Sequence, residues 1–432
     1  MRRVEAPPAS HPANPPRAEW LLPAGVAAYL VICTWSQRVP IPGNPVFGLM
    51  LAVLTATALG VSVQRGLRPS PRLLLVILVC AACLLTDVIY VEHIRFTDLG
   101  IYLLAGHHLI HGDPVYAGQA LIVMPRDATA LPFLYPPPTL LLFAGLVAFP
   151  LHLGGILFVA ASMAAVLLAA RRLGVVAPWS LAVLAWPPVL DGLVSGNVSV
   201  PLFAVFVLAP WVGSGLVVAP LFKPYNAVAA LWLFREHRFR AVLVGCAVVA
   251  GLCIVTLPLV GGPGAWLDWI GGLRAFAESE ANIPALYGAA LGRYAPVEIA
   301  LVAGVAVTIG ALRARGVEGL LRLGVATIVL QSSVYSHGFI VSLPALLSLR
   351  TAWFWVATAA LSITISTGPS LGPDIGWPGT WIPIVLVLAS WAVPSLRRDR
   401  STLDDPYHPL GRVSMPWPGA ETIAGPTTQF DA

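Results

Sequence analysis

Residues 73–91, LLLVILVCAACLLTDVIYV, are an apolar run with one charge, Asp87. A helix that crosses a bilayer needs roughly 20 such residues, so this run fits one membrane span. Similar runs recur along the 432-residue chain, which is 57% hydrophobic and only 10% charged. Soluble domains carry about 25% charged residues, and β-barrel strands give shorter, alternating runs. The sequence therefore predicts an all-α, polytopic transmembrane helical bundle.

Both ends of the chain differ from its middle. Residues 1–19 and 397–432 are polar and rich in proline, which predicts disordered tails around a membrane domain at 20–396. The apolar runs of that domain predict about 13–14 spans. We place them near 20–36, 46–63, 73–91, 156–170, 176–192, 200–213, a broken pair across 215–234, 240–259, 297–312, 318–335, 338–349, 352–367 and 379–395.

The basic residues predict the orientation, because cytoplasmic loops of membrane proteins are enriched in Lys and Arg. With both termini in the cytoplasm, most of the 25 basic residues fall on that side. They are Arg2, Arg3, Arg17, Arg65, Arg68, Arg72, Arg171, Arg172, Arg235, Arg238, Arg240, Arg313, Arg315, Arg322, Arg350, Arg397, Arg398, Arg400 and Arg412. The net charge of +5 is thus explained by basic residues on the cytoplasmic side of a plasma membrane protein. We expect no nucleic-acid partner.

Two outer loops follow from this topology. Residues 131–155, LPFLYPPPTLLLFAGLVAFPLHLGG, would reverse the sidedness if they spanned the membrane. We therefore expect a short juxtamembrane helix there, bounded by Pro136–Pro138 and Pro150, inside one structured outer loop at 92–155. A second outer loop is expected at 260–296.

The first outer loop opens with RFTDLGIYLLAGHHLIHGDPVY at 95–116. Asp98 would lie at the membrane mouth, where a carboxylate meets both lipid and water; it would equally serve as a helix N-cap. His107 and His111 are four residues apart and share a helix face, which permits a metal ligand pair. A polar rim on an interfacial helix explains them better, and we predict no metal site.

Lys223 is the one lysine of the chain, and it lies between Pro220 and Pro224 in GLVVAPLFKPYNAVAALWLF. A charge inside a membrane is costly unless it meets an anion or water, so Lys223 is a candidate functional residue. Snorkelling to the interface is the alternative. His337, in LQSSVYSHGFIVSLP, would contact a phosphate or pack as a hydrogen-bonded core histidine. Asn197, beside Gly196, indicates a helix break that lines a cavity.

Several of these stretches resemble glycosyltransferase family 87, the polyprenyl-phosphate-mannose-dependent α-mannosyltransferases of actinobacteria, which have the GT-C membrane architecture. The resemblance covers about residues 85–350 and is carried by FTDLGIYLLAGHHLIHGDPVY, LPFLYPPPTLLLFAGLVAFP, SGNVS, LFKPYNAVAALWLFREHRFRA, NIPALYGAALGR and YSHGFIVSLP, in that order. It implies that Asp98 is the general base and that Lys223 and His337, with Arg293, bind the donor phosphate. Acceptor or sugar binding is expected for His107, His111, Asp113, Tyr116, Tyr135, Asn197 and Asn282.

The implied reaction is transfer of mannose, with inversion, from a polyprenyl phosphate to a glycolipid or lipoglycan acceptor at the outer face. A phosphate leaves without being protonated, so one carboxylate base suffices and no metal or other cofactor is expected. A lipid or solute transporter is the rival hypothesis, because transporters also have broken helices and intramembrane charges. A transporter should tolerate Asp98→Asn, whereas a transferase should not.

Overall fold

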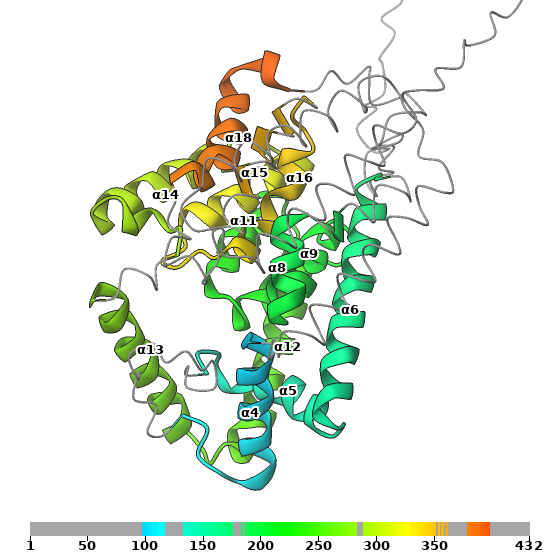
Figure 1. The fold of residues 1–432 in the computed structure, drawn as a ribbon, viewed down its shortest axis with the longest axis vertical. Helices are drawn as coiled ribbons and strands as arrows, with labels where there is room; N and C mark the ends of the chain where they lie inside the picture. Colours follow the sequence, from blue (N-terminus) through cyan, green and yellow to red (C-terminus); the bar gives the residue numbers. More distant parts are fainter. Residues whose placement is uncertain are drawn as a thin grey trace, which may run out of the picture.

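The computed structural model describes residues 97–116, 133–175, 183–184, 186–282, 288–350, 353–354, 356–357, 360–361 and 378–397. These residues are mostly helical (Figure 1), which confirms the predicted helical class. Within the described ranges the extended pairing consists of two isolated bridges, Gly288 with Val334 and Leu349 with Arg397. The expected spans near 20–36, 46–63 and 73–91 lie outside the described residues, as do the tail at 1–19 and residues 398–432.

The predicted first outer loop contains two helices. Helix α4 is Thr97–His111, and the 3-10 turn η3, Pro137–Thr139, leads into the short helix α5, Leu140–Val147. The expected short helix between prolines is thus confirmed, and α6, Leu151–Arg172, begins directly after Pro150. Proline suits these starts because it has no N–H to satisfy and a fixed φ.

Helices α4 and α5 pack closely, and a glycine permits the contact. A Cβ on Gly106 would lie 2.7 Å from the backbone carbon of Phe143, whereas a Cβ on Gly100 would meet nothing within 4 Å. We expect Gly106→Ala to lower the free energy of unfolding by about 1–3 kcal/mol, because backbone cannot move aside as a side chain can. Gly100→Ala on the same helix should be neutral or stabilising. Thermal unfolding in detergent compares the two, and equal midpoints would refute the packing.

Short helices form the centre of the molecule. The helix α8, Pro187–Ser195, ends at Gly196 and is followed by α9, Ser199–Leu208. The broken pair expected across 215–234 is confirmed, since residue 223 interrupts it in an extended conformation. Its parts are α10 Gly215–Val218, η4 Ala219–Leu221, η5 Pro224–Asn226 and α11 Ala227–Arg235.

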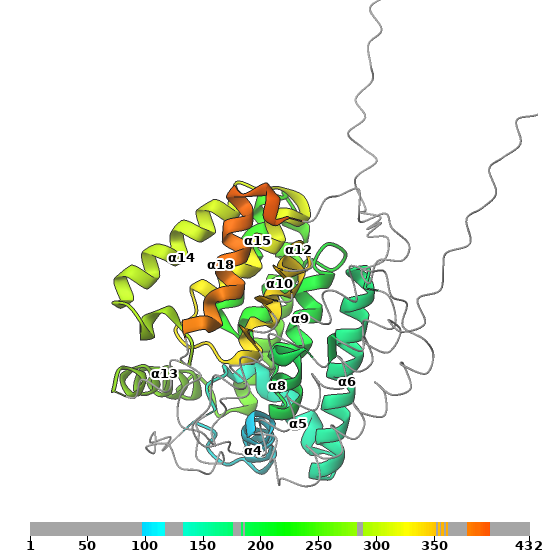
Figure 2. The same ribbon diagram turned by 45° about the horizontal axis from the view of Figure 1, so that its top comes forward.

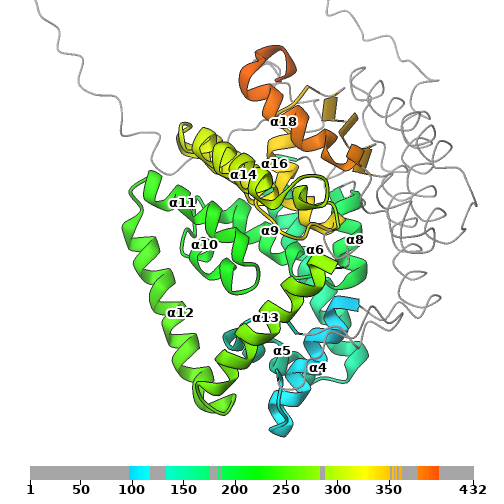
Figure 3. The ribbon, with the colours of Figure 1, turned by 90° about the vertical axis from the view of Figure 1, so that its left-hand side faces the viewer.

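Long helices follow. The helices α12, Phe239–Leu259, and α13, Gly264–Asn282, form the two arms of a V (Figure 3). The second expected outer loop is therefore largely one helix. After the turn η7, Leu291–Arg293, come α14, Val297–Leu312, and α15, Gly316–Val329, which pack against each other. Figure 2 shows α14 and α18, Ile382–Ala392, at the end of the molecule opposite to α4.

Several expected spans differ from the structure. In the span expected at 200–213 the helix α9 ends at Leu208, and α8, Pro187–Ser195, overlaps only the end of the span expected at 176–192. The span at 318–335 ends as a helix at Val329, because the polar residues from Gln331 onward leave the regular helix. The span at 338–349 begins in a 3-10 helix, η8, Ser336–Ser342, which is followed by one turn of α-helix, α16, Leu343–Leu346. The hydroxyl of Ser342 bonds the carbonyl of Phe339, and such local bonds compete with α-helical ones.

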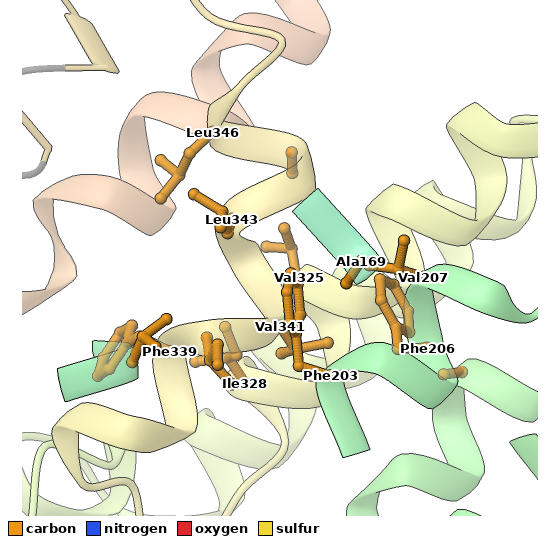
Figure 4. Packing of buried hydrophobic residues seen from close by; sticks show 14 of the residues in the cluster. Ala169, Phe203, Phe206, Val207, Val325, Ile328, Phe339, Val341, Leu343 and Leu346 are labelled. Carbon is orange, nitrogen blue, oxygen red and sulfur yellow. The ribbon is translucent and has the colours of Figure 1, made fainter. Parts of the chain in front are cut away.

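The main core joins α6, α9, α15 and η8. Figure 4 shows aromatic and aliphatic side chains of this core, from these elements and from α16. They include Ala169, Phe203, Phe206, Val207, Val325, Ile328, Phe339, Val341 and Leu343. The core therefore fixes α9 and η8 side by side, and both elements lead to polar residues at one end.

Two described helices, α6 and α12, are long and apolar enough to cross a membrane. α12 exposes large apolar side chains, with Leu243 70% and Ile254 71% exposed, and α14 does the same with Val302 at 68%. Apolar surface of this extent suits lipid rather than water. The total of 13–14 spans stays a prediction, since much of the expected bundle lies outside the described part.

The arginines expected on one side of the membrane are linked at one end of the described structure. The Arg172 guanidinium lies 5.2 Å from the Trp211 ring centre, and Arg238 donates to the carbonyl of Pro210. Arg235 donates to Leu312 O, and Glu318 pairs with both Arg322 and Arg397. The opposite ends of α6 and α9 lead toward α4 (Figure 1).

Candidate functional site

Asp98 lies in the first turn of α4 and contacts Asn197. The Asn197 Nδ2 donates to Asp98 Oδ2 at 2.6 Å, and Asn197 is only 3% exposed. Asp98 itself is partly exposed. Because the described helix includes Thr97, Asp98 lies within the helix rather than before it, and its carboxylate accepts from an amide outside the helix. The structure thus brings two predicted site residues into direct contact.

The backbone fixes which way the Asn197 amide points. Asn197 Oδ1 accepts the backbone N–H of Ser199 at 2.8 Å, at the start of α9. Only the amide nitrogen is left for Asp98, so Asp98 Oδ2 must be an acceptor. Asn197 follows Gly196, which has φ +67° and ends α8 in the left-handed conformation. A helix break at this position, as the sequence indicated, therefore orients the amide.

Two glycines, one in α8 and one directly after it, let α4 and η8 approach the C-terminal end of α8 closely. Gly192 and Gly196 are four residues apart, so they lie near each other along the end of the helix. A Cβ on Gly196 would be 2.6 Å from the Leu99 Cβ, and one on Gly192 would be 3.2 Å from the His337 Cβ. Asp98 and His337 therefore approach the same end of α8 from two different elements.

His337 is buried at 7% exposure and is held by Asp191 of α8. His337 Nδ1 lies 3.0 Å from Asp191 Oδ2, and the Ser336 hydroxyl donates to that oxygen at 2.6 Å. The imidazole also stacks on Tyr335, with 5.9 Å between ring centres. Both hypotheses for this histidine are compatible with its position, because the contact with Asp191 uses Nδ1 and not Nε2.

Lys223 is extended (φ −144°, ψ 102°) between η4 and η5, where Pro220 and Pro224 interrupt the helix. Its ammonium lies 5.8 Å from the Tyr225 ring centre and interacts electrostatically with Tyr225, Tyr135 and Asp98. Lys223 thus belongs to the same group of residues as Asp98.

A pocket between α9, the broken pair and η8 is largely apolar. Its polar lining side chains are Ser199, Lys223, Tyr225 and Asn226. The Ser199 hydroxyl is buried and has no hydrogen-bond partner among the described residues. The lining thus combines apolar side chains, a few polar groups and the Lys223 cation around a cavity of about 20 Å³.

Three tyrosines support the Asp98 side of the site. The hydroxyls of Tyr102 and Tyr135 are 2.8 Å apart, and the Tyr116 hydroxyl donates to the carbonyl of Tyr135 at 2.8 Å. Burial raises the pKa of Tyr135 to about 12, and the nearby Lys223 limits the rise. Burial, Tyr135 and Asp98 raise the pKa of Tyr102. Both phenols therefore stay neutral and can hydrogen-bond near Asp98 at physiological pH.

Asn282 and Arg293 lie on either side of residues 283–287, which are outside the described part of the chain. Arg293 Nη1 donates to the carbonyl of Gly288 at 3.0 Å, and Ala289 N donates to Val334 O at 2.6 Å. Arg293 thus belongs to a turn that pairs with the strand-like segment just before His337. Asn282 ends α13, but its side chain lies outside the described residues.

His107, His111 and Asp113 are not brought to this site. They are exposed toward or just beyond the far end of α4, where His107 lies about 14 Å and His111 about 20 Å from Asp98 along the helix axis at 1.5 Å per residue. The rings of His107 and His111 stack at 3.9 Å, and His111 Nδ1 donates to the carbonyl of His107 at 2.9 Å. Among the described residues, no group of three metal-binding side chains is found.

Sequence reasoning missed Asp191, Ser336 and Tyr102. Asp191 was given no role, although it is an isolated carboxylate at the end of an apolar run. That isolation was the available signal, because a charge there needs a partner. Tyr102 gave no signal, since one tyrosine in an apolar helix is ordinary.

Comparison with known families now gives one match. Residues 133–342 match glycosyltransferase family 87. The matched part contains Asp191, Asn197, Lys223 and His337, whereas Asp98 and α4 precede it. No curated protein and no solved structure matches the chain.

Proposed function

We propose that this protein, a glycosyltransferase by its family 87 domain at residues 133–342, transfers mannose from a polyprenyl phosphate to a glycolipid or lipoglycan. The enzyme would lie in the plasma membrane with both termini in the cytoplasm and its site at the outer face. The observation that carries the proposal is the contact of Asn197 Nδ2 with Asp98 Oδ2 at 2.6 Å. The contact holds the Asp98 carboxyl group in a fixed orientation, and a general base must be positioned in this way to reach the proton that it takes.

The reaction needs one base and one site for the leaving group. An acceptor hydroxyl attacks the anomeric carbon, its proton passes to Asp98, and the bond from that carbon to the phosphate oxygen breaks. The polyprenyl phosphate leaves with the bond electrons. Attack from the face opposite to the phosphate inverts the anomeric centre, so a β-linked donor gives an α-mannoside.

Basic side chains would bind the phosphate and stabilise its negative charge as it leaves. Lys223 is supported by its apolar pocket and its electrostatic interaction with Asp98, and His337 by its position at the end of α8. Positive groups near developing negative charge lower the barrier when they are already oriented. Arg293 would assist from the turn that pairs with the segment preceding His337.

The remaining candidates would bind sugars. Tyr135 lies partly exposed in the aromatic cluster beside Asp98 and could stack against mannose, whereas Tyr116 is buried and would act by holding Tyr135 in place. Because His107 is about 14 Å and His111 about 20 Å from Asp98 along the helix axis, these histidines and Asp113 would contact only parts of an acceptor remote from its reacting hydroxyl. Asn282 stays a prediction.

The proposal is tested by transfer of radiolabelled mannose from polyprenyl-phosphate-mannose to a membrane lipid extract by purified protein. We expect labelled glycolipid in the presence of a chelator, and no labelled product from a nucleotide-linked mannose. Failure to form labelled product from any of several polyprenyl-phosphate sugars would refute the donor class. Equal use of the nucleotide sugar would refute the need for a lipid phosphate.

Asn197→Ala tests the support of Asp98. The change removes the amide that orients the carboxylate and the acceptor for the Ser199 N–H, so we expect kcat to fall by about 10- to 100-fold. KM for the donor should change little, because Asn197 is placed with the base rather than with the phosphate. The matched control Asn226→Ala removes an amide from the pocket lining instead, and an equal loss of kcat in both variants would contradict this role.

A further inference from the structure

Asp191 is the carboxylate for which neither the sequence nor the proposed reaction gives a role. Three donors converge on its Oδ2, namely the Ser336 hydroxyl at 2.6 Å, the His337 Nδ1 at 3.0 Å and the His337 backbone N–H at 3.1 Å. The donors belong to the first turn of η8, whereas Asp191 belongs to α8. One oxygen thus joins two elements that lie far apart in sequence.

The contact determines how the His337 ring is presented. A carboxylate oxygen accepts only, so His337 Nδ1 must carry a proton when it bonds Asp191. Nε2 is then the ring nitrogen left for another group, and it can donate a hydrogen bond only when the ring is charged. Carboxylate partners stabilise that charge and fix the orientation of the ring, as they do for metal-bound histidines.

Other contacts leave the ring little freedom. The His337 ring lies nearly parallel to that of Tyr335, at 20°, and a Cβ on Gly192 would be 3.2 Å from the His337 Cβ. The side chain of His337 is 9% exposed and that of Asp191 is 33% exposed. The carboxylate therefore keeps some access to water, while the imidazole is enclosed.

We propose that Asp191 is a positioning residue that acts through His337. It holds Nδ1 and orients the imidazole ring so that Nε2 is presented to the phosphate of the polyprenyl donor. This inference rests on the proposed function, because it assumes that His337 meets that phosphate. Asp191 does not touch the donor, and its effect on binding requires the histidine.

A purely structural role for Asp191 makes different predictions. The same oxygen also accepts Ser336 and the backbone of η8, so Asp191 could serve only to anchor η8 to α8. An anchor would act whether or not residue 337 is a histidine. Asp191→Asn separates the two roles, because the amide oxygen can still accept hydrogen bonds while the charge is lost.

The experiment is a double-mutant cycle with Asp191→Asn, His337→Ala and the double variant. Binding of sugar-free polyprenyl phosphate and kcat/KM for polyprenyl-phosphate-mannose are measured on full-length protein. We expect Asp191→Asn to weaken binding and lower kcat/KM by about 10- to 100-fold, the range for hydrogen bonds to charged groups. In the His337→Ala background the same change should alter binding by less than about twofold.

The inference is overturned if Asp191→Asn has the same effect with and without His337, or has none in the wild type. Should Asp191→Asn not fold, as judged by thermal unfolding, Ser336→Ala takes its place. Ser336→Ala keeps the Asp191–His337 contact and should alter binding by less than about threefold, whereas a loss of tenfold or more would favour the anchor role.

Glu318→Gln is the matched control, because this carboxylate also bonds cationic side chains but lies at the arginine-rich end. We expect its binding and turnover to stay within about twofold of the wild type, as for other partly exposed ion pairs. A protein that binds polyprenyl phosphate through the Asp191–His337 pair but transfers no mannose would refute the proposed function and leave this inference intact. Mannose transfer that is insensitive to Asp191→Asn would refute this inference and leave the proposed function intact.

Discussion

Purified Asp98→Asn protein is expected to lose transfer activity by about 10²- to 10⁴-fold, the usual contribution of a general base. The amide oxygen of the new side chain can still accept the hydrogen bond from Asn197 Nδ2, so the local structure should persist. The amide cannot take a proton from the acceptor hydroxyl. The loss should therefore appear in kcat, while affinity for polyprenyl phosphate stays close to that of the wild type.

Asp268→Asn is the control for this variant, because Asp268 is an exposed carboxylate on α13. It should transfer mannose at the wild-type rate. If Asp98→Asn and Asp268→Asn are equally active, Asp98 is not the base. Loss of both binding and turnover in Asp98→Asn, with a lowered unfolding temperature, would instead indicate a structural role for the carboxylate.

The second large effect is expected for Lys223→Met, which keeps the length of the side chain but removes its charge. We expect kcat/KM for the lipid-linked donor to fall by about 10²- to 10³-fold, since a fixed cation at a developing charge has effects of this size. Affinity for polyprenyl phosphate should fall as well, because the charge also contacts the ground-state phosphate. Both quantities are measured on protein in detergent micelles.

Arg274→Gln is the matched control, since Arg274 is an exposed cation on α13. It should leave phosphate affinity unchanged. A Lys223→Met protein that binds polyprenyl phosphate as the wild type does would show that Lys223 is not a phosphate ligand and would restore the snorkelling hypothesis.

Local patterns predicted the helices well. The helix α14 begins and ends at the expected residues 297 and 312, and the prolines around residue 223 predicted the break there. The end of α15 was predicted less well, because the hydroxyl-rich stretch after Val329 remains apolar enough to resemble a span. The 3-10 geometry of η8 depends on local hydroxyl bonds and on Asp191, which no periodicity reveals.

The site was predicted in part. Asp98, Lys223 and His337 were recognised individually because charged and polar groups in an apolar chain are costly and therefore informative. Their grouping depends on two glycines that let α4 and η8 approach α8, and one sequence does not reveal such a contact. Asn197 was expected to bind sugar, but its amide is engaged by Asp98 and Ser199. The His107 pair was expected near the acceptor, yet it lies at the other end of α4.

The configuration of the product tests the central claim most directly. Mannose from a β-linked polyprenyl-phosphate donor is transferred by the wild-type protein, and the new glycosidic bond is examined by NMR and by sensitivity to α-mannosidase. A single displacement assisted by Asp98 predicts an α-linked product. A β-linked product would require two displacements and a nucleophilic residue, which would contradict Asp98 as the base of an inverting reaction.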